Sequence, residues 1–254
     1  MIRLRKLREA TERGHAISKL ARFSDEELAS VLAPAASTGP ERVAAQSFAT
    51  QMIEAAEHYR PEDCDHALSM ALALLPVNEV VDSVLSPVLV EVGERWHAGR
   101  FTVSQERIVT GAVRKQVGAV IETYNKITSG PPIVFATMPD ELHELGLLMS
   151  ALVAASRGAR CHYIGPDIPT MDIATYATRV GAAAVLLSFV LRDPRTPAAP
   201  GLADLAARLP RNIRIWIGGR ATSDIDLSAL RDRITVLSDY ASFQRELDAT
   251  LSTR

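Results

Sequence analysis

The sequence has little cysteine, and the little it has forms no pattern. Only Cys64 and Cys161 occur among the 254 residues, and neither lies close to another cysteine or in the spacing of zinc ligands. Isolated thiols of this kind are typical of proteins from a reducing compartment. We therefore expect a cytoplasmic protein without disulfide bonds.

Long apolar runs and an excess of one charge are also missing. The apolar runs are too short to cross a bilayer, and the basic N-terminus lacks the apolar segment of a signal peptide. The net charge is −2, so no overall positive field favours nucleic acid. With 47% hydrophobic and 23% charged residues, the composition is that of a soluble globular protein, and we expect no association with membranes.

The sequence motifs of common enzyme classes are absent as well. The chain contains no P-loop for binding phosphate, and no Ser-His-Asp arrangement is evident. Nothing in the sequence requires catalysis, and we expect a protein that is not an enzyme.

Proline and glycine divide the chain into three segments. Residues 33–40 are small residues with two prolines, and residues 128–132 form a second stretch of this kind. Taking these two stretches as boundaries, we predict domains over residues 1–33, 41–126 and 131–254.

The first segment is short and basic. Between Met1 and Phe23 there are seven basic and two acidic residues, a local balance of +5. The run Ser24–Glu27 has the pattern of a helix capping box. We expect a short helical segment, and a charge run of this kind is usually a solvated helix face.

The second segment, residues 41–126, has the spacing of amphipathic helices. Apolar residues recur at helical intervals from Val43 onward, and the pattern is interrupted at Pro76 and at the turn 98–100. Because the connections are short, we predict an antiparallel bundle of about four helices. After the helix that includes Val43, the predicted helices are 63–75, 77–96 and 103–124.

From Ile133 the pattern changes to short apolar runs that alternate with helical stretches. Five such runs within about 120 residues predict a doubly wound parallel sheet of flavodoxin-like size. The fold class is therefore an α/β domain preceded by an all-α bundle. In such sheets ligands bind beyond the carboxyl ends of the strands. The predicted strands are 133–136, 161–164, 184–190, 213–217 and 234–237, and the predicted helices are 145–156, 171–180, 203–209, 225–230 and 240–251.

A loop that contains a histidine follows the first predicted strand. Residues 138–146 read Met-Pro-Asp-Glu-Leu-His-Glu-Leu-Gly, so that Glu141 stands two residues before His143 and Gly146 three residues after it. An imidazole can bind a metal through one ring nitrogen while a nearby carboxylate holds the other N–H. Glycine at the start of a helix allows a bulky group to lie against the backbone. The loop therefore predicts a metal-ligating histidine, with a surface histidine as the alternative.

This loop and two later strand ends resemble the cobalamin-binding module of corrinoid methyltransferases, mutases and cobalamin photoreceptors. That family has an acid-x-His-x-x-Gly loop, a serine after the third strand and Gly-Gly after the fourth, which correspond here to Glu141-Leu-His143-Glu-Leu-Gly146, Ser188 and Gly218-Gly219. The resemblance implies a Rossmann-like domain in which His143 is the lower axial ligand of cobalt. It also implies that the dimethylbenzimidazole tail of cobalamin lies alongside Gly146, Ser188 and the two glycines. Glu141 stands where many members have Asp.

A second motif lies in the predicted bundle. Trp96-His97 is followed by Glu106-Arg107, which resembles the upper-face signature of CarH-type light-dependent regulators, a Trp-His pair before a Glu-His pair. The resemblance implies that Trp96 covers the upper face of the cobalamin, that Glu106 hydrogen-bonds its adenosyl group, and that His97 ligates cobalt after light breaks the Co–C bond. Arg107 departs from the histidine usual in the family. The residues alone also allow Trp96 as a core aromatic and His97 as a helix-terminal residue.

Over nearly the whole chain, the resemblance implies a cobalamin-dependent light sensor and regulator. Adenosylcobalamin would lie between the bundle and the sheet, and its photolysis would change the packing of the bundle and hence assembly or partner binding. Residues 4–21 resemble the last helices of a MerR-type DNA-binding domain without its reading head, so we do not expect this chain alone to bind DNA. We expect a homo-oligomer, dimer or tetramer, and a protein partner for the output.

Three alternatives share this layout. Photocobilins are truncated CarH-like proteins that bind a bilin, such as biliverdin, as well as cobalamin. A corrinoid methyl-carrier protein would pass a methyl group between enzymes, and His97 as an upper ligand would compete with that transfer. A cobalamin-sensing antirepressor would bind a transcription factor, a role with which the basic first segment is compatible.

Overall fold

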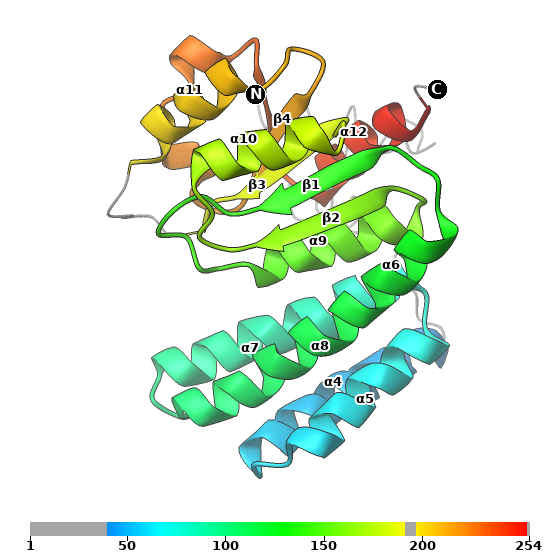
Figure 1. Ribbon diagram of the computed structural model, residues 1–254. Coiled ribbons are helices and arrows are strands. Elements are labelled where there is room, and N and C mark those ends of the chain that lie inside the picture. The colour runs from blue at the N-terminus through cyan, green and yellow to red at the C-terminus, as the bar shows by residue number, and fades with distance from the viewer. Residues whose placement is uncertain (1–39, 191–196, 253–254) are drawn as a thin grey trace, which may run out of the picture. The chain divides into compact units, whose positions relative to one another are not determined.

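The computed structural model describes residues 40–190 and 197–252 (Figure 1). The predicted helical remnant over residues 1–33 lies outside the described residues. The bundle and the sheet both belong to one compact unit, residues 45–254. No helix in the described part of the chain is long and apolar enough to span a membrane.

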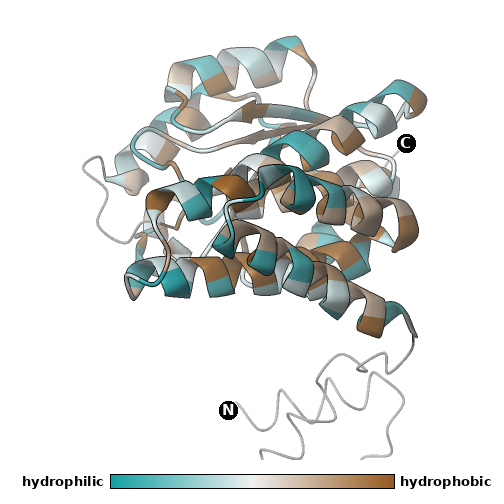
Figure 2. Cartoon of the chain, turned by 90° about the horizontal axis from the view of Figure 1, so that it is seen from below, coloured by the Kyte–Doolittle hydropathy of each residue, from teal (hydrophilic) through white to brown (hydrophobic). Residues whose placement is uncertain are grey.

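The second segment folds into a bundle of amphipathic helices, as predicted. Hydrophobic and hydrophilic residues alternate along its helices (Figure 2). In the first helix the buried stripe is made mostly of alanine, with Met52 as its one large residue, whereas Val43 is exposed. Small side chains allow the helices to pack closely. The elements are α4 (Pro40–Glu57), α5 (Pro61–Leu74), α6 (Val77–Glu79), the π-helical turn η1 (Val80–Leu85), α7 (Ser86–His97) and α8 (Val103–Ile127).

The helix that runs through α6, η1 and α7 contains a widened turn. Ser86 donates its backbone N–H to the carbonyl of Val81, five residues earlier, and its hydroxyl donates to the same carbonyl at 2.7 Å. The next residue, Pro87, has no N–H, and its ring would clash with the carbonyl four residues earlier in a regular α-helix. The π-helical turn accommodates this proline inside the helix that leads to Trp96 and His97.

The third segment forms the predicted parallel sheet, with strand order β2-β1-β3-β4-β5. Helices α10 and α11 pack on one face of the sheet, and α9 lies on the other face, against α8 (Figure 1). The sheet is thus doubly wound. The elements are β1 (Pro132–Ala136), α9 (Leu145–Ser156), β2 (Arg160–Gly165), α10 (Thr170–Arg179), β3 (Ala184–Ser188), α11 (Ala198–Arg208), β4 (Arg214–Gly218), β5 (Ile234–Leu237) and α12 (Tyr240–Ser252).

Two sequence-based expectations for this domain were wrong. Residues 225–230 do not form an α-helix, since Asp226 accepts the N–H of Ser228 at 2.9 Å, and only two short 3₁₀ turns occur, at Thr222–Asp224 and Ser228–Leu230. This local side-chain bond competes with the helix. The third strand ends at Ser188 rather than at Val190, because the N–H of Val190 is bonded to a side chain and not to a neighbouring strand.

Helix α8 covers one edge of the sheet. The edge strand is β2, and the side-chain amide of Asn125 donates to the carbonyl of Cys161 at 2.7 Å while its oxygen accepts the N–H of Cys161 at 2.9 Å. One side chain therefore satisfies both backbone groups of an edge residue, as a neighbouring strand would. This contact holds the C-terminal part of α8 against the sheet.

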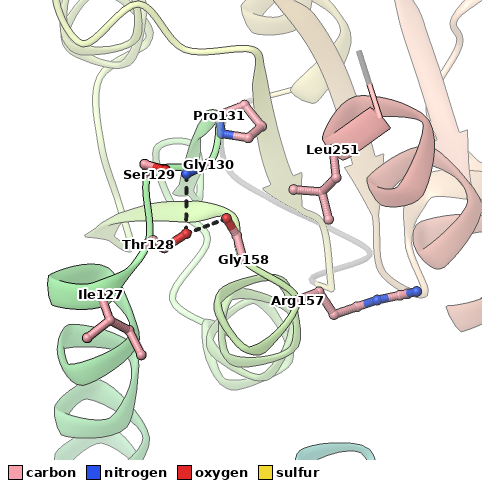
Figure 3. A pocket seen from close by; sticks show the side chains of 8 residues that line it. All are labelled: Ile127, Thr128, Ser129, Gly130, Pro131, Arg157, Gly158 and Leu251. Carbon is pink, nitrogen blue, oxygen red and sulfur yellow. Dashed lines mark hydrogen bonds between the residues drawn. The ribbon is translucent and has the colours of Figure 1, made fainter. Parts of the chain in front are cut away.

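The passage from α8 to β1 is an ordered turn at the amino edge of the sheet (Figure 3). Thr128 donates its hydroxyl to the carbonyl of Gly158 at 2.6 Å and accepts the N–H of Gly130 at 3.2 Å. These residues line a surface hollow of about 330 Å³. A Cβ atom added to Gly130 would lie 1.8 Å from the oxygen of Gly158, so only glycine fits there.

We expect Gly130→Ala to lower the free energy of unfolding by about 1–3 kcal/mol, because the added methyl group overlaps backbone that cannot move cheaply. Gly118→Ala is the matched control. Gly118 lies within α8 with no atom within 4 Å of the added Cβ, so this change should stabilise the protein by about 0.5–1 kcal/mol. Thermal or urea unfolding measures both values. Equal stability of the two variants would contradict the close approach at Gly130.

Candidate functional site

The strand ends that the sequence predicts to bind a ligand lie together at one edge of the sheet. Ala136, the last residue of β1, pairs in register with Leu187, and Ser188 pairs with Gly218. Because β1, β3 and β4 are parallel neighbours, the loop after β1, Ser188 and the glycine pair share the carboxyl edge. In Figure 1 this edge lies at the left of the view.

Glu141 is the anchor of the histidine loop. Its side chain is buried, with the residue only 4% exposed. One carboxylate oxygen accepts the backbone N–H of His143 at 2.9 Å and contacts the ring Nδ1 at 2.6 Å, while the other accepts the N–H of Val190 at 2.7 Å. The carboxylate thus ties the β1–α9 loop to the end of β3 and fixes the orientation of the imidazole.

His143 presents its free face to solvent. Its side chain is 52% exposed, and because a carboxylate oxygen accepts a proton from Nδ1, the ring atom left for a metal is Nε2. Across residues 40–190 and 197–252, no group of three or more His, Cys, Asp or Glu side chains could hold a metal ion. The exposed Nε2 of His143 would serve a metal that brings most of its own ligands and takes one nitrogen from the protein, as cobalt in a corrin does.

Two further residues support the loop and were not identified from the sequence. The hydroxyl of Thr137 donates to the carbonyl of Glu141 and accepts the N–H of Asp167 at 2.9 Å, while a carboxylate oxygen of Asp167 accepts the N–H of Asp140, also at 2.9 Å. Both aspartates have left-handed backbone conformations, with φ of 68° and 59°. The sequence Gly165-Pro166-Asp167 is typical of a turn and could have indicated that Asp167 supports the histidine loop.

The glycines predicted to lie beside the cobalamin tail differ in their surroundings: one borders open space and another is required by the backbone. Gly146 lies in the first turn of α9, and a Cβ added there would meet no atom within 4 Å, so the surface beside it is open. Gly219 has φ of +103°, and a Cβ there would lie 2.3 Å from the carbonyl oxygen of Phe189. Gly219 is therefore required by the backbone, and Ser188 beside it is only 6% exposed. Of these residues, Gly146 offers open surface, whereas Gly219 and Ser188 are packed into the end of the sheet.

Trp96 and His97 end helix α7. Their rings form a T-shaped pair, with centroids 4.8 Å apart and planes at 87°. Trp96 is 45% exposed, which excludes the interpretation of a core aromatic. His97 donates its Nδ1–H to the carbonyl of Gly93 at 2.9 Å, since a carbonyl can only accept, and Nε2 is again the ring atom left for a metal.

Glu106 lies in the first turn of α8, next to the residue that departs from the family pattern. Arg107 is 64% exposed and lies with its Nε 3.4 Å from a carboxylate oxygen of Glu106. Where a histidine would offer a ring nitrogen, the arginine offers a permanent positive charge that partners the neighbouring acid.

The turn between α7 and α8 is held by polar contacts. Thr102 and Gln105 form a capping box, in which each side chain accepts the backbone N–H of the other, at 2.9 and 3.3 Å. Arg95 lies over the ring of Phe101 at 5.2 Å and donates to Glu91 at 2.6 Å. The turn lies at the left of Figure 1, as does the carboxyl edge of the sheet. The α7–α8 turn and the carboxyl edge of the sheet, which carry the two sets of predicted ligand-binding residues, therefore lie on the same side of the unit.

Comparison with known proteins identifies a family and several relatives. A family model described as a B12 binding domain matches residues 49–121, which lie within the bundle. The HTH-type transcriptional repressor CarH of Myxococcus xanthus is 31% identical over 223 residues, which cover 86% of this chain and 74% of the relative. Dimethylamine corrinoid protein 1 of Methanosarcina acetivorans is 24% identical over 161 residues, which cover 60% of this chain and 74% of that protein.

A solved structure shares the fold. The monomethylamine corrinoid protein of Methanosarcina barkeri superposes with a TM-score of 0.59 at 16% identity, covering 80% of this chain and 99% of that one. At this identity the likeness concerns the fold alone. The similarity to CarH extends over most of both chains. The chain therefore belongs to the CarH-type family of cobalamin-binding proteins.

Proposed function

We propose that this protein is a light sensor that binds adenosylcobalamin and whose output is a change in its own assembly or in the binding of a protein partner. The observation that carries the proposal is the pair of histidines, His143 and His97, each with Nδ1 held by a fixed acceptor and Nε2 left for a metal. The name of the Myxococcus xanthus relative, a transcriptional repressor, supports a regulatory output. We propose a sensor rather than an enzyme, acting in the cytoplasm as a homo-oligomer.

On the lower side, His143 would hold the cobalt of the cofactor. The buried carboxylate of Glu141 accepts from Nδ1, which keeps the imidazole in one orientation and makes Nε2 a better donor to a metal. The tail of the cofactor would lie along Gly146, Ser188 and the glycine pair, where the first offers open surface and the others a close-packed wall.

On the upper side, residues of the bundle would respond to light. Adenosylcobalamin, when bound, supplies a Co–C bond that visible light breaks. Trp96, which is half exposed at the end of α7, would cover the upper face, and Glu106 would accept hydrogen bonds from the adenosyl group. In the absence of that group, His97 would be the residue able to offer Nε2 to the metal. Such a change at the end of α7 would alter its packing and shift the population of bundle conformations.

A methyl-carrier function is the second candidate. It is favoured by the similarity to a dimethylamine corrinoid protein of Methanosarcina acetivorans. His97 favours the light sensor over the methyl carrier, because a histidine bound to the upper face of cobalt would compete with transfer of a methyl group. For the bilin alternative, burial raises the pKa of the Cys64 thiol to about 12 and also raises the pKa of Cys161, so neither thiol is a good nucleophile. A bilin would have to bind without a covalent link.

The spectrum of the reconstituted protein tests the light response. We expect green light to convert the dark adenosylcobalamin spectrum into that of a stable bis-histidine cobalamin, and His97→Ala to abolish this product because the upper nitrogen is gone. Absorption spectroscopy before and after illumination measures the change.

His58→Ala is the matched control for this experiment. His58 is also exposed at a helix end and bonds through Nδ1 to a carbonyl four residues earlier, that of Glu54, at 2.8 Å. Its loss should leave the light product unchanged. If His97→Ala forms the same light product as the wild type, His97 is not the upper ligand and the methyl-carrier function gains support.

The anchoring role of Glu141 can be measured by affinity. We expect Glu141→Gln to weaken the binding of hydroxocobalamin by about 10–100-fold, because the amide no longer offers a charged acceptor to Nδ1 of His143. Glu141→Asp should retain most of the affinity, since aspartate is common at this position in the family. Titration followed by absorbance gives the dissociation constants. Wild-type affinity in the Gln variant would show that the carboxylate does not orient the ligand.

A further inference from the structure

The residue after His143 is a second buried acid that the proposed ligation does not use. Glu144 is 7% exposed, and both of its oxygens have partners. Arg114 donates to one oxygen from Nε at 2.5 Å, and the hydroxyl of Tyr163 donates to the other. Charge-assisted bonds of this kind are stronger than neutral ones, and a buried carboxylate that lost a partner would be costly.

The three residues of this cluster come from three different elements. Arg114 belongs to α8 of the bundle, Tyr163 to β2 at the edge of the sheet, and Glu144 stands at the start of α9, where its carbonyl accepts the N–H of Leu148 at 2.9 Å. Glu144 is therefore the point at which the bundle is bonded to the loop that carries His143. A change in its position moves the backbone of the neighbouring residue.

Helix α8 connects this cluster with the upper face. Glu106 lies eight residues before Arg114 on the same continuous helix, a distance of about 12 Å along its axis. The far end of α8 is held against β2 by Asn125. Arg114 is 38% exposed, so its guanidinium can be hydrated if it leaves Glu144, whereas Glu144 cannot be. The contact lies between a fixed end of the helix and an end that would meet the cofactor.

We propose that the Arg114–Glu144 pair couples the two axial sides of the cofactor: the position of α8, set at the upper face by Glu106, orients the His143 loop and so sets the strength of the lower axial bond. Glu144 is a positioning residue in this scheme, because its carboxylate oxygens are bonded to Arg114 and Tyr163 and it would act on the metal only through His143. The inference rests on the proposed function. By thermodynamic linkage, a stronger lower bond also favours the position of α8 from which it arises.

The test uses cob(II)inamide, which lacks the dimethylbenzimidazole tail, so that any axial nitrogen seen by electron paramagnetic resonance comes from the protein. We expect nitrogen ligation in the wild type. In Glu144→Gln and in Arg114→Met, the ratio of ligated to unligated cobalt should fall by about tenfold. The double variant should fall no further than either single one, since both remove the same contact. Arg114→Lys keeps the charge and should restore part of the ratio.

Lys115→Met is the matched control. Lys115 is the next residue on α8 and pairs with Asp65 of α5 at 2.8 Å, so its loss removes an ion pair of the same helix that stays within the bundle. It should leave the ratio unchanged. Thermal unfolding of each variant separates loss of fold from loss of ligation, and Arg114→Lys, which keeps a charged partner for Glu144, remains informative if Glu144→Gln or Arg114→Met fails to fold.

The outcomes distinguish this inference from the proposed function. Absence of nitrogen ligation in the wild type would overturn His143 as the lower ligand, and with it the proposed function. Ligation in the wild type that persists unchanged in Glu144→Gln or Arg114→Met would overturn the coupling alone. Effects of the two substitutions that add in the double variant would also overturn it, because independent residues behave in that way.

Discussion

The geometry of the candidate site depends on the buried carboxylate of Glu141, which is shielded from water. A buried carboxylate is stable only if hydrogen-bond donors surround it, and at Glu141 those donors are two groups of His143 and the N–H of Val190. The same bonds that offset the burial of the charge therefore bring the loop after β1 against the end of β3. Arg220 extends the arrangement, because its Nε donates to the carbonyl of Val190 at 3.1 Å. The position of the imidazole that we propose as the metal ligand is therefore set by the hydrogen bonds that the buried carboxylate requires.

The two histidines share a geometry although their surroundings differ. His143 is held by a carboxylate on a loop, and His97 by a backbone carbonyl at a helix end. A carboxylate makes an imidazole a stronger and more permanent ligand than a neutral carbonyl does. The difference supports the proposal that His143 would stay bound to cobalt in every state and that His97 would bind in only one of them.

Much of the fold and of the site could be predicted from the sequence, because both depend on local patterns. The period of the apolar residues predicted β5 and α9 with their observed bounds, and the three strand-end motifs do lie at one edge of the sheet. The predicted helix at 225–230 failed because Asp226 bonds its own backbone. Asn125 with Cys161 and Arg114 with Glu144 join residues 30 or more positions apart, and no local pattern records such pairs.

The π-helical turn before α7 has a consequence for how the bundle can change. A π turn holds about one residue more than an α-helical turn, so the residues beyond it are out of register with those before it. If that extra residue were absorbed elsewhere, α7 would turn by about 100° about its axis and advance by about 1.5 Å, since each residue of an α-helix contributes that much. Trp96 and His97 would then move together, as a unit, to a different direction around the helix. A shift of the π turn would therefore move the end of α7 by a whole-residue step and not by gradual bending.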